Sequence, residues 1–255
     1  MLNKAMNVAR AALNPGNALV MAKKVVKRLV DRTDRTSMEK NLAWIHANCQ
    51  DFGVYASAAN PELWEEAQAY GRELRARAAE ILSAAGVSMG GGGFYPMLYF
   101  LARQRRPEVI VETGVAAGYS SQVFLKALAL NGRGSLYSSD FPYFRMKDPE
   151  KYIGILVEKQ FKPNWHLYVK GDDANLPQIL ESIHQVDLFH YDSDKTYSGR
   201  ALAMSKVVPK MARSGLIVMD DIQDNTFFKE YVEQHADRLF SVFEFEGKFI
   251  GFAEV

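Results

Sequence analysis

The chain has 255 residues, of which 48% are hydrophobic and 24% are charged, and its formal net charge at pH 7 is +1. These values predict a soluble globular protein with one large domain, or one domain with an appendage, and they exclude the strongly positive charge of a nucleic-acid binder. No apolar run approaches the roughly 20 residues of a membrane span. Cys49 is the single cysteine, so an internal disulfide is excluded and a cytoplasmic location is expected.

The first 36 residues carry eight Lys or Arg and only two Asp, with apolar residues interleaved. This pattern predicts a basic amphipathic helix, which packs on a partner subunit or lies on an anionic membrane surface. The same basic residues interrupt the stretch near the start that would otherwise resemble a secretory signal. We favour packing on a second copy of the chain, which predicts a homo-oligomer, over membrane association.

Two further helices are predicted before residue 90. Thr36-Ser37-Met38-Glu39 has the pattern of a capping box and opens a helix that runs through Ile45. Asn60-Pro61 supplies an N-cap and a first-turn proline to a long helix that ends at Gly86. Four glycines at 90–93 then interrupt the pattern and form either a lid or a linker. We therefore divide the chain into a helical N-terminal extension, residues 1–89, and a second domain, residues 90–255.

After Pro107 the pattern changes to short apolar strands that alternate with helices. The predicted strands are Val109–Val111, Ser135–Ser138, His166–Val169, Leu188–Tyr191 and Leu216–Met219, followed by 239–245 and 249–255. The alternation predicts a parallel sheet of βαβ units, and Glu246-Gly247-Lys248 between the last two strands predicts a terminal antiparallel hairpin. The expected fold is a doubly wound, Rossmann-like α/β domain with a seven-stranded sheet and a helical N-terminal extension.

Acidic residues follow two of these strands directly. Asp192, Asp194 and Lys195 come after one apolar run, and Asp220 and Asp221 come after the next. Ligands of open α/β sheets bind beyond the carboxyl ends of the strands, so we expect these side chains to meet in a charged site. The alternative is that they are solvated loop residues or helix caps. The sequence thus indicates an enzyme whose site is able to hold a divalent metal.

The first strand leads into a glycine-containing loop, Glu112-Thr113-Gly114-Val115-Ala116-Ala117-Gly118. Gly114 and Gly118 allow a tight turn and a close approach to a ligand at the start of the next helix, which favours a nucleotide-like cofactor. Ala116 occupies a position where the dinucleotide fingerprint needs glycine. The second strand ends at Asp140, where an acid is able to bind both hydroxyls of a ribose.

Taken together, these motifs resemble the class I S-adenosylmethionine-dependent methyltransferases. Within that class the likeness is to metal-dependent O-methyltransferases of the catechol and caffeoyl-coenzyme A type, and to bacterial relatives that act on sugars and antibiotics. It covers roughly residues 90–255. The motifs that carry it are Glu-x-Gly-x-x-x-Gly at 112–118, Asp140, Gly-Asp-Asp-Ala at 171–174 and Asp-x-Asp-Lys at 192–195.

The resemblance implies a cofactor site with residues from three strand ends. Its members are Glu112, Gly114, Gly118, Ser120, Asp140, Asp172 and Asp173. Glu112 and Gly114 would line the methionine part of S-adenosylmethionine. Asp140 would bind its ribose, and Asp172 or Asp173 would lie near its adenine. Relatives of this kind also use N-terminal helices to pair subunits or to cover the active site, so both roles are open for residues 1–89.

The resemblance also implies that Asp192, Asp220 and Asp221 hold Mg²⁺ or another divalent cation. Mg²⁺ prefers hard oxygen ligands and keeps positions open, so two substrate oxygens are able to bind it. Asp192 and Lys195 are the candidate catalytic residues, with Lys195 as a base if its pKa is lowered, and otherwise as an ion-pair partner. Two departures leave the acceptor open: catechol-type enzymes often have Asn in place of Asp221, and the sugar-directed relatives often have His in place of Lys195.

The expected function is an Mg²⁺-dependent O-methyltransferase that acts on a hydroxyl of a small molecule, such as a sugar of a natural product or a catechol. The alternatives are a nicotinamide-dependent oxidoreductase on the same architecture and a non-catalytic protein that binds S-adenosylmethionine. Ala116 argues against the first alternative, and the intact set of Asp192, Lys195, Asp220 and Asp221 argues against the second. His190 is either a core residue or a neighbour of the acidic site.

Overall fold

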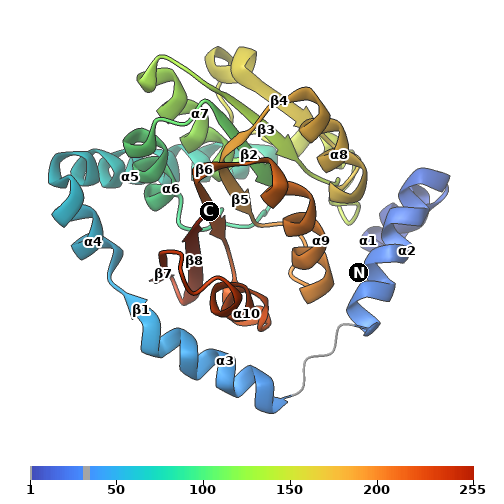
Figure 1. Ribbon diagram of the computed structural model, residues 1–255. Coiled ribbons are helices and arrows are strands. Elements are labelled where there is room, and N and C mark those ends of the chain that lie inside the picture. The colour runs from blue at the N-terminus through green and yellow to red at the C-terminus, as the bar shows by residue number, and fades with distance from the viewer. Residues whose placement is uncertain (1, 31–34) are drawn as a thin grey trace.

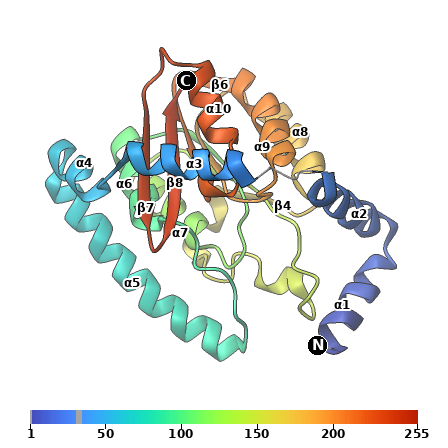
Figure 2. The same cartoon turned by 90° about the horizontal axis from the view of Figure 1, so that it is seen from below.

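A computed structural model describes residues 2–30 and 35–255. The basic N-terminal segment forms two helices, α1 (Leu2–Ala12) and α2 (Pro15–Val30). The two aspartates of that segment, Asp31 and Asp34, lie outside the described residues. Figures 1 and 2 show α1 and α2 as an arm beside the body of the protein, with α2 close to α8 (Asp172–Ser182) and α9 (Tyr197–Val207).

The predicted doubly wound α/β fold is confirmed by a sheet in which the described residues form eight strands in the order β1-β7-β8-β6-β5-β2-β3-β4. The strands are β1 (Cys49–Gln50), β2 (Val109–Thr113), β3 (Ser135–Ser139), β4 (Trp165–Tyr168), β5 (Val186–Tyr191), β6 (Met211–Met219), β7 (Phe240–Phe245) and β8 (Lys248–Glu254). Of these strands β8 alone runs antiparallel to its neighbours. The strand order reverses at β2 and β5, and this switch point is where such sheets bind ligands.

The sheet differs from the prediction of seven strands by the addition of β1. Cys49 and Gln50 pair in parallel with Val242 and Phe243 of β7. A strand of two residues has too few positions to show an alternating pattern, so its pairing depends on the neighbouring strand and not on its own sequence. β1 joins the N-terminal third of the chain directly to the sheet of the second domain.

Helices cover both faces of the sheet and form two buried cores (Figure 1). On one face lie α4 (Phe52–Ala59), α5 (Pro61–Ala85), α6 (Tyr95–Arg105) and α7 (Tyr119–Asn131), and on the other lie α3 (Arg35–Asn48), α8, α9 and α10 (Phe227–Gln234). Short 3₁₀ turns span Pro149–Tyr152, Lys159–Asn164, Val208–Lys210 and Ile222–Asp224. Alternate residues of a strand point to opposite faces, so Leu188 enters the first core and Phe189 the second.

The ends of α5 agree with the signals in the sequence. The side chain of Asn60 accepts a hydrogen bond from the Leu63 backbone N–H, and Pro61 follows it at the first helical position. Gly86 ends the helix with a φ of +64°, in the left-handed region that glycine adopts without strain. These signals were readable because each depends on residues a few positions apart.

None of the helices in residues 2–30 and 35–255 combines the length and the apolarity that a membrane crossing requires.

We expect Asn60→Ala to lower the free energy of unfolding by about 1 kcal/mol, because the N-terminal N–H groups of α5 lose their side-chain acceptor. Urea unfolding followed by circular dichroism measures the change. Ser57→Ala, at an exposed position of α4, is the matched control and should change the free energy by less than about 0.5 kcal/mol. Equal unfolding midpoints for the two variants would show that the Asn60 side chain does not stabilise the start of α5.

Candidate functional site

Parallel pairing brings the ends of β2, β5 and β6 to one point at the carboxyl edge of the sheet. The Asp192 N–H donates to the Thr113 carbonyl at 2.9 Å, and the Asp220 N–H donates to the Tyr191 carbonyl at 3.0 Å. Each bond extends a strand pair by one residue beyond its last ladder position. The predicted meeting of the acidic residues therefore follows from strand register.

Three of the predicted acids lie together. One carboxylate oxygen each from Asp192, Asp220 and Asp221 lies within 4.8 Å of the others. Asp220 is only 1% exposed, and neither of its carboxylate oxygens accepts a hydrogen bond from the described residues. Buried carboxylates without donors are costly unless a cation or a proton compensates them. The geometry and the oxygen ligands of this cluster fit a divalent cation.

Two lysines contact the same carboxylates. Lys195 forms an ion pair and a hydrogen bond with Asp192, and its Nζ lies 2.9 Å from Asp221 Oδ2 and 3.9 Å from Asp220 Oδ2. Lys248 Nζ lies 3.2 Å from Asp221 Oδ1. Lys248 reaches the site because β8 runs antiparallel to β6, which places the start of β8 beyond the carboxyl end of β6. At the hairpin tip, Glu246 forms an exposed ion pair with Arg75.

The crowding of charges shifts their pKa values in opposite directions. Burial raises the pKa of Asp220 to about 7, and the Asp192 carboxylate adds to the rise. Burial by itself would raise the pKa of Asp221, but Lys195 and Lys248 lower it. Burial by itself would lower the pKa of Lys195, but the three carboxylates raise it. Lys195 is therefore a protonated ion-pair partner here, and the lowered pKa that a base requires is absent from this arrangement.

Asp194 is separate from this cluster. Its Oδ1 accepts hydrogen bonds from the N–H and the hydroxyl of Thr196, which is itself the N-cap of α9. Of the acids after β5, Asp192 thus belongs to the carboxylate cluster, while Asp194 shapes the turn that starts the next helix.

The glycine loop after β2 passes very close to the end of β5. Gly114 has a φ of +86°, and a Cβ at this position would lie 2.4 Å from the Asp192 carbonyl oxygen. Ala116 has a φ of +46°, and its N–H donates to Asp140 Oδ2 at 2.9 Å. The N–H of Phe141 donates to the other oxygen of Asp140. Asp140 therefore organises the loop in addition to facing the cavity.

Glu112 lies beneath this loop and has no exposed surface. Its carboxylate accepts hydrogen bonds from the hydroxyls of Ser120, Ser121 and Ser138 at 2.5 to 2.8 Å. His190 on the neighbouring strand is buried, with its Nδ1 3.8 Å from Glu112 Oε1. Glu112 thus ties β2 to β3 and α7, and His190 belongs to this buried group.

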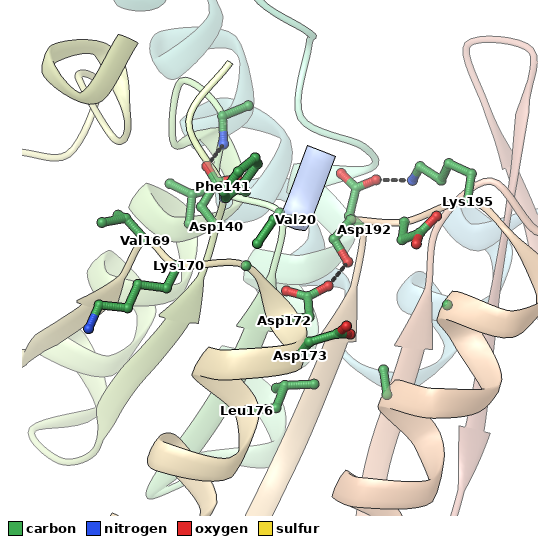
Figure 3. A pocket seen from close by; sticks show the side chains of 18 of the residues that line it. Val20, Asp140, Phe141, Val169, Lys170, Asp172, Asp173, Leu176, Asp192 and Lys195 are labelled. Atoms are coloured by element: carbon green, nitrogen blue, oxygen red, sulfur yellow. Dashed lines mark hydrogen bonds and ion pairs between the residues drawn. The ribbon is translucent and has the colours of Figure 1, made fainter. Parts of the chain in front are cut away.

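A cavity of about 780 Å³ runs along the carboxyl edge of the sheet (Figure 3). The sequence-predicted residues that line it are Gly114, Ser120, Asp140, Asp172, Asp173, Asp192, Asp194, Lys195 and Asp221. Glu112, Gly118 and Asp220 are not among the described residues that line it. Gly118 instead serves the loop's own packing, since a Cβ there would lie 2.8 Å from the Gly154 Cα. The volume lies within the range of about 300 to 1,000 Å³ that is usual for small-molecule sites.

The end of β4 supplies the next part of the lining. Asp172 accepts hydrogen bonds from the hydroxyls of Ser139 and Ser193, so it links the ends of β3 and β5. The buried amide of Asn175 donates to Ser139 Oγ and to the carbonyls of Tyr168 and Asp140. These bonds hold the three strand ends in a fixed relation around the cavity.

Helix α2 forms one wall of the cavity. Val20 projects from α2 into the space between Asp140 and Asp172 in Figure 3. Its Cγ1 lies close to Gly171, since a Cβ added to that glycine would lie 3.4 Å from it. Lys23 Nζ lies 3.6 Å from Asp173 Oδ2. The basic arm that the sequence analysis placed on a partner subunit or at the active site thus contacts the cavity within the same chain.

Several residues that hold the site were not predicted from the sequence, namely Asn41, Asn175, Arg200, Asn225 and Lys248. Asn41 of α3 donates to the carbonyls of Ile222 and Asn225, and Asn225 donates to the Lys195 carbonyl. These bonds join residues up to 184 positions apart. No local pattern signals such contacts. The only visible clue was that Lys248 is a charged residue in the predicted terminal hairpin.

Comparisons with known proteins place this geometry in context. Residues 111–222 match a family described as a methyltransferase domain. The fold resembles an O-methyltransferase from Bacillus cereus in complex with SAH, with 15% identity, a TM-score of 0.52, and coverage of 83% of this chain and 100% of that chain. It also resembles TomG from Streptomyces achromogenes, an O-methyltransferase of tomaymycin synthesis in complex with SAM, with 16% identity, a TM-score of 0.54, and coverage of 80% and 95%. A methyltransferase from Geobacter sulfurreducens aligns at 15% identity, a TM-score of 0.54, and coverage of 72% and 90%.

No curated protein matches the sequence. The family match and the shared fold agree on the same class of domain, and residues 111–222 contain the loop after β2, Asp140, Asp172, Asp192 and both acids after β6.

We expect the stability of the metal-free protein to fall between pH 5 and pH 8. Asp220 has a folded pKa of about 7, above its ordinary value of 3.8, so the folded state binds more protons than the unfolded state in this range. The associated stability is present at low pH and is lost as the pH rises to 7. Asp220→Asn should be more stable than the wild type at pH 8 by an amount on the order of 2 kcal/mol.

Urea unfolding in chelator at pH 5 and pH 8 measures how the free energy of unfolding changes with pH in the wild type and in Asp220→Asn. Asp237→Asn, at an exposed position after α10, is the control and should follow the wild type at both pH values within about 0.5 kcal/mol. A wild-type protein that is as stable at pH 8 as Asp220→Asn would contradict the buried, uncompensated carboxylate.

Proposed function

We propose that this chain is a class I S-adenosylmethionine-dependent methyltransferase with a donor site and an acceptor site, and that it methylates a hydroxyl oxygen of a small molecule held at a divalent cation, with Mg²⁺ as the expected metal. The observation that carries this proposal is the position of the carboxylate cluster. Asp192 and Asp221 belong both to the cluster and to the lining of the cavity.

The donor would lie along the ends of β2, β3 and β4. Asp140 lines the cavity at the end of β3, and a carboxylate at this position suits the two hydroxyls of a ribose. Phe141 and Asp172 line the cavity beyond it, where a ring and an acid suit an adenine. Gly114 and Ser120 line the part nearest to Asp192, where the methionine portion would lie. Glu112 would act from below by fixing Ser120 and would not contact the cofactor directly.

Asp192, Asp220 and Asp221 would hold the metal. The unsatisfied oxygens of Asp220 and the ammonium of Lys195 among the three carboxylates both support a cation at this point. When bound, a divalent cation acidifies and orients a hydroxyl. The remaining requirement is alignment, because methyl transfer needs the oxygen in line with the departing sulfur at about 3 Å from the methyl carbon.

The chain's own residues would provide that alignment. Gly114 brings the loop after β2 against the Asp192 backbone, so the donor and the carboxylate cluster are held at a fixed separation. Gly90 to Gly93 line the same cavity, and an ideal Cβ on Gly93 would lie 3.4 Å from Asp220 Oδ2. The glycine run therefore suits a cover over the acceptor. Lys195 would accept the hydroxyl proton once a bound metal reduces the hold of the carboxylates on its ammonium.

Four wider features belong to the same proposal. We infer that residues 1–89 act as an extension that covers the active site and that residues 90–255 form the catalytic domain. Pairing of two copies through the outer face of the N-terminal helices is consistent with the exposure of Met6, Val25 and Val26. The single cysteine agrees with a cytoplasmic location. The acceptor would be a sugar hydroxyl of a natural product or a catechol.

Isothermal titration of S-adenosylmethionine, S-adenosylhomocysteine and NAD, each with Mg²⁺ and with chelator, tests the donor site. We expect micromolar binding of the two sulfur compounds and none of NAD. Asp220→Ala should lower metal-dependent release of S-adenosylhomocysteine with catechol and sugar acceptors by about 100-fold or more, and change cofactor affinity only a few-fold. Asp237→Asn should retain wild-type turnover. Unchanged turnover in Asp220→Ala would remove the metal assignment, and NAD binding alone would overturn the donor assignment.

The role of α2 as a cover is tested by two valines of the same helix. Val20 lines the cavity, whereas Val26 is 57% exposed. We expect Val20→Asp to weaken S-adenosylhomocysteine binding by about tenfold, because a carboxylate there faces Asp140 and Asp172 and separates the arm from the cavity. Val26→Asp should bind within threefold of the wild type. Equal affinities for the two variants would show that the arm does not cover the donor.

A further inference from the structure

Arg200 is a charged side chain that the proposed chemistry does not use. It lies on α9, on the side of the sheet that holds α8 and α10, and it has no exposed surface. It is the largest of the fully buried side chains in the described part of the protein. A guanidinium group loses much hydration on burial, so its retention at this position calls for a compensating role.

The contacts of Arg200 are few and point to one place. Its Nη2 donates to the backbone carbonyl of Asp221 at 2.8 Å, and its guanidinium carbon lies 5.8 Å from the centre of the Tyr191 ring. Its Nε and Nη1 have no hydrogen-bond partner among the described residues. The polar contact of this buried cation is therefore directed at the residue that follows Asp220.

Asp221 needs such a contact because its backbone is unusual. Its φ is +52°, in the left-handed region that residues with a Cβ rarely adopt. This turn directs the Asp221 carboxylate toward Lys195 and Lys248, at 2.9 and 3.2 Å, instead of continuing β6. The same carbonyl accepts from the Asp224 N–H in the short turn that follows. A rotation of the peptide after Asp221 would break both bonds to its carbonyl.

We propose that Arg200 is a positioning residue of the carboxylate cluster: its hydrogen bond to the Asp221 carbonyl holds Asp221 in the left-handed conformation that brings its carboxylate to Asp192 and Asp220. The positive charge of Arg200 also interacts with Asp220, Asp221 and Asp224 and so favours their ionised forms. The guanidinium acts through the backbone and touches neither the donor nor the acceptor. This inference rests on the proposed metal site for its functional meaning.

Two variants separate the hydrogen bond from packing. Arg200→Met keeps the apolar length of the side chain and removes the donor and the charge, and Arg200→Lys keeps the charge and one donor. Val207→Ala is the matched control, because Val207 is fully buried in the same helix and its truncation loosens packing without touching Asp221. Affinity for Mn²⁺ and for S-adenosylhomocysteine is measured by isothermal titration on the full chain.

We expect Arg200→Met to weaken Mn²⁺ binding by about tenfold or more and S-adenosylhomocysteine binding by less than threefold, with Arg200→Lys between it and the wild type. Val207→Ala should lower the unfolding midpoint and keep both affinities within threefold. The inference is overturned if Arg200→Met binds Mn²⁺ as the wild type does, or if Val207→Ala loses as much Mn²⁺ affinity as Arg200→Met. Should Arg200→Met fail to fold, the same criteria apply to Arg200→Leu, which also removes the donor and the charge.

A second readout requires no metal and keeps this inference distinct from the proposed function. In chelator, acetic anhydride modifies Lys195 and Lys248 at rates that report how firmly Asp221 holds the two ammonium groups. Mass spectrometry measures these rates relative to the rate at exposed Lys162. Arg200→Met should raise both rates several-fold over the wild type and over Val207→Ala. If the wild type bound no Mn²⁺, the metal assignment would fail, while faster labelling would still support the positioning role and equal labelling would overturn it.

Discussion

Repulsion among three carboxylates at the carboxyl edge of the sheet is the constraint on which the surrounding structure depends. Asp192, Asp220 and Asp221 bring oxygens within 4.8 Å of one another in a largely buried place. Like charges at this distance are unfavourable unless cations or protons compensate them. In this protein Lys195 and Lys248 pair with the carboxylates, while burial, with the Asp192 carboxylate adding to it, still raises the pKa of Asp220.

The framework around the cluster is built to keep these groups in place. Strand register brings Asp192 and Asp220 together, and hydrogen bonds from the ends of β5 and β6 to their neighbours fix the two backbones. Asn41 and Asn225 anchor the turn after β6 from the other side. A cluster with this much support is preorganised, so a metal and an acceptor would bind without first paying for the ordering of their ligands.

The proposed donor and acceptor ends of the cavity are linked through the same backbone. Gly114 lets the loop after β2 pass against the Asp192 carbonyl. A ligand on the loop and a ligand on the carboxylates would therefore be held at a fixed distance from each other. Helix α2 closes the opposite wall with Val20 and Lys23. The arm therefore lines the cavity with one face and leaves Met6, Val25 and Val26 exposed.

The sequence by itself determined the elements and the chemistry at the strand ends, because both depend on short-range patterns. Apolar runs predicted β2 to β8, Asn60 and Gly86 predicted the limits of α5, and the acids after β5 and β6 predicted the cluster. Only the tertiary structure decided what distant residues do to them. It buried Glu112 under three serine hydroxyls, paired β1 with β7, brought Lys248 and Arg200 to Asp221, and laid α2 along the cavity. These contacts join residues far apart in the chain, and their energies come from burial and charge in the assembled fold, which no local pattern encodes.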